Sequence, residues 1–215
     1  MAPPTIRLYR PADRPAVRAI ACETAERGEP VERFFPDREV FADLLTMYYT
    51  DWEPDALWVA EQDSRVMGYL TGCLDTRRYH RVMAARIIPR AAWLGLRRGA
   101  LLHRETWRLA QAGLVTWRLG GLAHVPLDAY PAHLHCNIAP GFRDRQAGTG
   151  LVTQFLTQVA DARLPGVHAA VRGDNARACR FFERLGFAMV GRARVAWPAG
   201  RTLTMHETLM YGKRL

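Results

Sequence analysis

The chain has 215 residues, of which 49% are hydrophobic and 24% charged, a composition typical of a folded globular protein rather than a disordered one. Residues 1–15 lack the apolar core of a secretion signal, and no apolar stretch is long enough to span a membrane. We therefore expect one domain over residues 1–215, a cytoplasmic location and no membrane partner.

The net charge is +9, and Lys213 is the only lysine among 30 basic residues. This arginine bias is typical of GC-rich codon usage, so only part of the positive charge is expected to have a functional role. A basic surface favours acidic partners such as nucleotide phosphates or an anionic substrate. A nucleic-acid-binding role would rest on charge alone, and we do not expect one. Four widely spaced cysteines predict packed, reduced thiols rather than disulfides or a zinc site: Cys22, Cys73, Cys136 and Cys179.

The first third of the chain predicts a strand, two helices and a hairpin. Apolar residues recur at helical spacing between Val40 and Tyr49, which predicts the second helix. Two β-rich runs flank Asp63 and Ser64, which predicts the hairpin. The expected ranges are 6–9, 11–26, 40–49, 57–61 and 66–73.

Residues 76–131 are unusual, with ten arginines against two acidic residues and with three tryptophans. Glycines and Pro89 interrupt the segment, so we predict two or three short helices that pack on the domain. We expect packing roles for Trp93, Trp107 and Trp117. Two interpretations of the arginines stay open, namely a roof over an acceptor pocket and a solvated helical surface.

From Ala132 onward the pattern predicts strand, glycine turn, helix, strand, helix and two strands. Asp174 or Asn175 is expected to cap the second of these helices, and Gly186 to end it. The expected strands are 132–139, 166–171, 188–195 and 202–213, and the helices lie around 151–159 and 178–185.

The turn from Arg145 to Gly150 lies between a strand and an apolar helix. Its glycines allow a ligand to approach the backbone, and the first amides of the helix favour an anion such as a pyrophosphate. An ordinary tight turn with two glycines is the alternative. The spacing matches neither the dinucleotide-binding fingerprint nor the P-loop.

Two motifs together resemble the GNAT superfamily of N-acetyltransferases over residues 132–192. The phosphate-binding pattern R/Q-x-x-G-x-G/A is matched at Arg145, Gly148 and Gly150. The downstream pattern N-x-x-A-x-x-F-Y-x-x-x-G-F is matched at Asn175, Ala178, Phe181, Gly186 and Phe187.

The resemblance implies an α/β fold with a mixed central sheet of about seven strands that is splayed in the middle. Helices would cover both faces, and the helical insertion of residues 76–131 would lie between the third and fourth strands. Acetyl-CoA would be the co-substrate, without a metal. Its implied binding residues are Asn137, Ile138, Ala139, Arg145, Gln146, Ala147, Gly148, Thr149, Gly150, Leu151, Asn175 and Phe182. Many members carry a tyrosine that protonates the leaving thiolate where this chain has Phe182, so the general acid is unassigned.

Acyl transfer to an amine requires a base, because only the neutral amine is nucleophilic. Side chains alternate along a strand, so His133, His135 and Asn137 share one face beside the implied slot. Imidazole has a suitable pKa, and we predict His135 as the base with His133 behind it. This stretch is similar to the two-histidine strand of arylalkylamine N-acetyltransferases and to the acetyltransferase-like domains of O-GlcNAc hydrolases. Histidines satisfied within the core are the alternative.

The predicted function is therefore an N-acetyltransferase that moves an acetyl group from acetyl-CoA to an amine by direct attack in a ternary complex. A small amine is the favoured acceptor. A protein or peptide acetyltransferase and a non-catalytic acyl-CoA-binding module are the alternatives. We expect a monomer or a homodimer.

Overall fold

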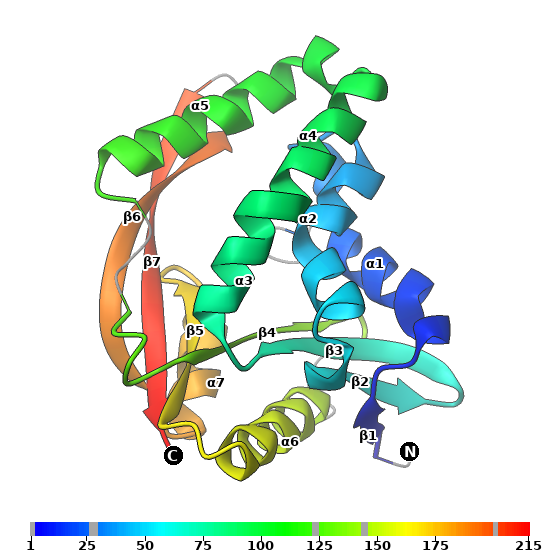
Figure 1. Ribbon diagram of the computed structural model, residues 1–215, viewed down its shortest axis with the longest axis vertical. Helices are drawn as coiled ribbons and strands as arrows, with labels where there is room; N and C mark the ends of the chain where they lie inside the picture. The colour runs from blue at the N-terminus through cyan, green and yellow to red at the C-terminus, as the bar shows by residue number, and fades with distance from the viewer. Residues whose placement is uncertain (1–2, 26–29, 122–124, 143–145, 200–201) are drawn as a thin grey trace.

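A seven-stranded sheet forms the centre of the computed structural model, which describes residues 3–25, 30–121, 125–142, 146–199 and 202–215 (Figure 1). The strand order is β1-β2-β3-β4-β5-β7-β6, and β4 and β5 are parallel while the other neighbours are antiparallel. This mixed sheet confirms the predicted fold class. The strands are β1 (Thr5–Leu8), β2 (Leu57–Gln62), β3 (Arg65–Cys73), β4 (Ala132–Ile138), β5 (Gly166–Arg172), β6 (Ala188–Ala199) and β7 (Thr202–Arg214).

Helices cover both faces of the sheet because each buries one apolar side. On one face, α1 (Arg14–Glu23) and α2 (Arg38–Asp51) pack Val17 and Tyr48 against Val59 and Tyr69 of the sheet. On the other face, α6 (Ala147–Asp161) and α7 (Ala176–Arg184) build a second core that includes Phe155. Burial of these apolar faces supplies most of the stabilisation of such helices.

The local predictions around turns and caps hold with small shifts. Asp63 and Ser64 both have positive φ, at 50° and 59°, which is the conformation of a tight hairpin turn. The Asn175 side chain accepts a hydrogen bond from the Ala178 amide at 3.1 Å and caps α7. Gly186 has a φ of 80° and ends this helix, as predicted. The strand expected to end at residue 195 instead runs to Ala199, because its antiparallel pairing with β7 continues.

The insertion forms a longer first helix than predicted. The helix α3 (Thr76–Val82) continues through a π-helical turn, η4 (Met83–Ile87), into α4 (Ile88–Arg97). Pro89 was expected to interrupt the segment, but it lies in the first turn of α4, where no amide donor is needed, and the widened turn precedes it. A short 3-10 turn, η5 (Ala100–Leu102), then leads to α5 (Arg104–Arg118). None of the described helices has both the length and the apolar character that crossing a membrane requires.

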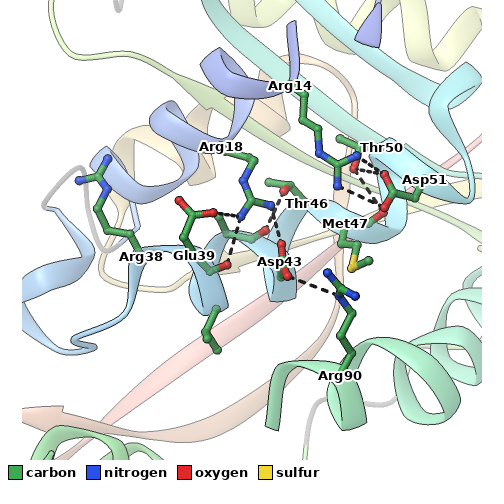
Figure 2. A network of polar contacts seen from close by, with 12 residues as sticks. Arg14, Arg18, Arg38, Glu39, Asp43, Thr46, Met47, Thr50, Asp51 and Arg90 are labelled. Carbon is green, nitrogen blue, oxygen red and sulfur yellow. Dashed lines mark hydrogen bonds and ion pairs between the residues drawn. The ribbon is translucent and has the colours of Figure 1, made fainter. Parts of the chain in front are cut away.

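Ion pairs with α2 hold α4 in place (Figure 2). The buried carboxylate of Asp43 contacts Arg18 of α1 at 2.6 Å and Arg90 of α4 at 3.8 Å. The Asp37 carboxylate caps α2 by accepting from two backbone amides, and it also binds the Arg98 guanidinium at 2.6 Å. At the other end of the insertion, the Thr116 hydroxyl accepts from a β6 amide at 2.9 Å. The insertion is therefore fixed to the domain at both ends.

Asp37→Ala should destabilise the protein by about 1–2 kcal/mol through the lost cap. Burial opposes ionisation of Asp37, but the Val40 amide and Arg98 outweigh it and lower the pKa. Because the folded-state pKa is lowered, the stabilisation is complete above the unfolded value of about 3.9 and is lost as the pH falls through the folded value. Denaturant unfolding should show the stability difference between wild type and variant shrinking as the pH falls below about 3.9. A constant gap would contradict the assignment, and the exposed Asp161→Ala is the control.

Candidate active site

The sheet opens between β4 and β5. These parallel strands pair only at Ala132 with Val167 and at His133 with His168. Beyond His133, β4 keeps its pairing with β3 on one side, whereas its other edge has left β5. This is the splay that the resemblance implies, and it leaves backbone groups of β4 available to a ligand.

The pairing with β3 decides which backbone groups face the gap. The Ala139 amide donates to the Met67 carbonyl at 2.8 Å, so Ala139 points towards β3. Backbone direction alternates in an antiparallel pair, so Asn137 also points towards β3, while Cys136 and Ile138 face the gap. Of the implied binding residues 137–139, Ile138 therefore turns its backbone groups to the gap, and so does Cys136, which was not among the implied residues.

The start of α6 follows the end of β4 and has backbone amides without a partner in the helix. Gln146 precedes the helix with φ at 60°, a left-handed conformation that is uncommon for a residue other than glycine. The first hydrogen bond of the helix runs from the Gly150 amide to the Gln146 carbonyl at 3.0 Å. The amides of residues 147–149 consequently have no partner within the helix, and the helix dipole favours an anion there. Arg145 lies outside the described residues.

The two glycines of this turn have different reasons to be glycine. A Cβ at Gly150 would lie 2.9 Å from the Ile6 side chain of β1, so packing alone requires glycine there. A Cβ at Gly148 would make an ordinary contact with the Phe181 ring at 3.5 Å. The packing of the described residues therefore does not exclude a side chain at Gly148.

His133 is enclosed by protein groups on both ring nitrogens. The Thr76 hydroxyl donates to the Pro131 carbonyl at 2.6 Å, so its oxygen accepts from the His133 Nδ1–H at 2.8 Å. His133 Nε2 is then the acceptor for the Tyr49 hydroxyl at 2.9 Å. Burial lowers the pKa of His133 to about 3, and the neighbouring histidines add to the shift. The ring is therefore neutral at physiological pH and held as one tautomer.

Thr76→Val should destabilise the protein by about 1–3 kcal/mol, because the Nδ1–H of His133 would be buried without an acceptor. The matched control is Thr46→Val, since the buried Thr46 hydroxyl bonds only to the Ala42 carbonyl of its own helix turn. Equal losses for the two variants in urea unfolding would show that Thr76 has no special role in holding His133.

His135 lies on the same face of β4 but is exposed. Burial of the ring by the surrounding protein lowers its pKa, although part of the side chain reaches the surface, and a hydrogen bond with the Asn137 side chain opposes the shift. Asn137 is itself fixed, because its side-chain amide donates to the buried Tyr69 hydroxyl at 2.8 Å. In β5, Ala170 is exposed on the matching face. An accessible imidazole therefore stands at the centre of the sheet, next to the free edge of β4.

Comparisons with known proteins agree with this geometry. The acetyltransferase (GNAT) family matches residues 119–187, which include β4, the turn before α6, β5 and α7. The crystal structure of SsHAT is 27% identical to the chain with a TM-score of 0.70, and the match covers 99% of this chain and 98% of SsHAT. Residues 119–187 thus match the GNAT acetyltransferase family, and the whole chain shares the fold of SsHAT.

More distant structures share the GNAT fold over their whole length. The ribosomal-protein-alanine N-acetyltransferase from Brucella melitensis is 17% identical with a TM-score of 0.58, and the match covers 98% of this chain and 99% of that one. The structure of yncA from Salmonella typhimurium, which contains its cofactor acetyl-CoA, is 12% identical with a TM-score of 0.56, and 100% and 95% of the two chains are covered.

Phe182 stands where many GNAT enzymes have a tyrosine, and it is buried. Its ring packs against Phe187 and stacks on Tyr211 with the ring centroids 6.2 Å apart. The Tyr211 hydroxyl donates to Glu183 at 2.8 Å and is thereby engaged on α7. The side chains around Phe182 thus form part of the core rather than an evident proton donor.

Sequence reasoning missed Cys136, Tyr49 and Thr76. Strand alternation could have indicated Cys136, but only the register with β3 shows which residues turn their backbone to the gap. Tyr49 and Thr76 are distant in sequence from His133 and come from α2 and α3. No sequence pattern links them to the histidine.

Proposed function

We propose that this GNAT enzyme transfers the acetyl group of acetyl-CoA to a small amine by direct attack in a ternary complex. One observation carries the proposal: the exposed His135 stands beside the free edge of β4, and α6, whose first amides have no partner within the helix, begins beyond the end of the same strand. A candidate base, a free strand edge and a helix start suited to an anion are therefore all found at or just after β4.

The backbone would do most of the donor binding. The amides of Ala147, Gly148 and Thr149 suit the pyrophosphate, because the helix dipole and free N–H groups both favour an anion. The gap-facing backbone of Cys136 and Ile138 can pair with the amides of the pantetheine arm. Either amide could also donate to the thioester oxygen as negative charge develops there, which is the electrostatic part of the catalysis.

His135 would remove the proton from the acceptor. An alkylammonium with a pKa of about 10 is almost wholly protonated at neutral pH, so deprotonation is needed before attack. The lowered pKa of His135 keeps the ring neutral and able to accept a proton, and its exposure lets it pass the proton to solvent. His133 would support the strand behind it, since both its nitrogens are already occupied.

The thiolate would leave without a tyrosine at position 182. A thiol with a pKa near 8.5 is a tolerable leaving group at neutral pH, unlike an alcohol. General acid catalysis typically contributes about 10²–10⁴-fold, so its loss slows turnover without preventing it.

A small acceptor fits the position of the insertion. The insertion contacts α2, where Arg98 binds Asp37, and it contacts β6, where the Thr116 hydroxyl accepts from the Ala196 amide. It therefore borders the side of the sheet from which His135 is reached, and it limits the approach of a bulky acceptor. Arg98 and Arg97 are engaged by Asp37 and by the Trp93 ring, so they serve the insertion itself.

Initial-rate kinetics with a panel of small amines and short peptides test the proposal. Direct attack predicts intersecting double-reciprocal lines when both substrates are varied, and faster thiol release with small amines than with peptides. Parallel lines would instead indicate an acetylated enzyme. Tight acetyl-CoA binding without turnover of any amine would favour the non-catalytic module, and preference for peptides would overturn the small-amine assignment.

A further inference from the structure

The insertion displays an unusual concentration of apolar side chains. Thirteen large hydrophobic residues are exposed in the described chain, and eight of these lie between residues 88 and 119. They are Ile88, Trp93, Leu96, Leu102, Trp107, Leu114, Trp117 and Leu119. Single exposed apolar residues are normal on a protein surface, but such a concentration typically marks an interaction site. The packing roles expected for the three tryptophans are corrected, because 55%, 61% and 73% of their surfaces are exposed.

These side chains form ordered outer faces of two helices. On α4, Ala91 and Gly95 are buried towards the domain while Ile88 and Leu96 face outward. On α5, Ala112 and Thr116 are buried while Leu114 and Trp117 face outward. Both helices are held from behind by the contacts with α2 and β6. The eight exposed apolar residues between Ile88 and Leu119 are called the apolar arch below.

Arginine accompanies the apolar side chains. Residues 76–121 contain ten arginines and one acidic residue, Glu105. The Arg97 guanidinium lies over the Trp93 ring at 4.7 Å, and Arg86, Arg104 and Arg118 are exposed. A partner must therefore accept apolar side chains and supply negative charge. A symmetric contact between two copies would bring the arginines together, so charge complementarity argues against a second copy of this chain.

The shape of the arch also restricts the partner. The helices α4 and α5 meet at one end of the long axis of the molecule (Figure 1), and Leu102 in their junction is 89% exposed. A projecting apolar tip cannot enclose a peptide, but it can insert into a deformable surface. Helices with aromatic and aliphatic residues on one side and arginines around them are typical of binding to the interface of anionic bilayers.

We propose that the apolar arch docks this enzyme peripherally onto an anionic lipid bilayer. The tryptophans and leucines would enter the headgroup region, and the flanking arginines would contact anionic headgroups. The contact lies on the outer faces of α4 and α5, away from the buried faces that fix the insertion to the domain. This proposal departs from the sequence-based expectation of no membrane partner, and it does not depend on the proposed acceptor.

Co-sedimentation of the full chain with vesicles tests the proposal, using phosphatidylcholine alone or mixed with phosphatidylglycerol. We expect binding to the mixed vesicles only, weakened by salt, with a blue shift of tryptophan emission. Leu102→Glu and Trp117→Glu should each weaken binding at least tenfold, and so should the triple variant of Arg86, Arg104 and Arg118 to glutamine. Met189→Glu is the matched control, because Met189 is exposed on β6 outside the arch, and it should bind as wild type.

Three results would overturn the proposal. They are the absence of binding to anionic vesicles at low salt, equal binding to neutral vesicles, and a loss with Met189→Glu as large as with Trp117→Glu. A dimer in solution that Trp117→Glu dissociates would instead assign the arch to a second copy, and it would also refute the lipid assignment. Circular dichroism and unfolding of each variant establish that its fold is retained.

Discussion

Replacing His135 with alanine is expected to lower kcat/KM by about two orders of magnitude or more while the affinity for acetyl-CoA stays nearly constant. The exposed ring beside the free edge of β4 is placed to take a proton from the acceptor, whereas the phosphate-binding amides lie at the start of α6. The affinity for acetyl-CoA should therefore be unaffected by the substitution. Steady-state kinetics and calorimetric titration with acetyl-CoA separate the two effects.

The pH–rate profile makes this prediction specific to a base. The pKa of His135 is lowered, so the neutral form persists to a lower pH than for an ordinary histidine. The acidic limb of the wild-type profile should lie below about 6.5 and should disappear in His135→Ala. His103→Ala is the control, because His103 is exposed before α5 and should leave the profile unchanged. An acidic limb that survives in the His133→Ala/His135→Ala double variant would show that neither histidine is the base.

Gly148→Val is expected to raise the Kd of acetyl-CoA strongly without unfolding the protein. A hydrogen bond to a charged group contributes about 1.5–3 kcal/mol, so losing one bond to the pyrophosphate raises the Kd by about 10- to 150-fold. A Cβ at this position would lie 3.5 Å from the Phe181 ring, which leaves room for a side chain within the protein. The branched side chain should therefore obstruct the ligand rather than the fold.

Two companion variants keep this result interpretable. A Cβ added at Gly113 in α5 would meet no described atom outside its own stretch of helix within 4 Å, so Gly113→Val should change neither binding nor stability greatly. Gly150→Val should both weaken binding and destabilise the protein, because its side chain presses on Ile6. An unchanged Kd in a folded Gly148→Val protein would remove the pyrophosphate from the start of α6.

Local patterns were sufficient for most of the fold. Apolar spacing located α2, the positive-φ turn at Asp63 and Ser64 joined a predicted hairpin, and Asn175 with Gly186 bounded α7. Each of these depends on neighbours within a few residues. The π-helical turn before Pro89 was missed, because the spacing of helix breakers does not reveal that one turn can widen to accommodate a proline.

The same distinction between local and long-range contacts applies to the candidate site. The glycine turn and the face shared by His133, His135 and Asn137 follow from short motifs and strand alternation. The difference between the two histidines does not, because Tyr49 and Thr76 reach His133 only after α2, α3 and β4 have packed together. The exposure of the three insertion tryptophans could not be predicted either, because an amphipathic pattern does not show whether an apolar helix face packs against the domain.

Product analysis by mass spectrometry tests the central claim most directly. Purified protein, acetyl-CoA and a reactive small amine from the panel are incubated, and the acetylated amine and the released CoA thiol are quantified together. Transfer by the wild-type protein predicts one acetylated amine per thiol, with both falling about a hundredfold or more in His135→Ala. Thiol release without acetylated amine, or equal product from wild type and His135→Ala, would contradict the account.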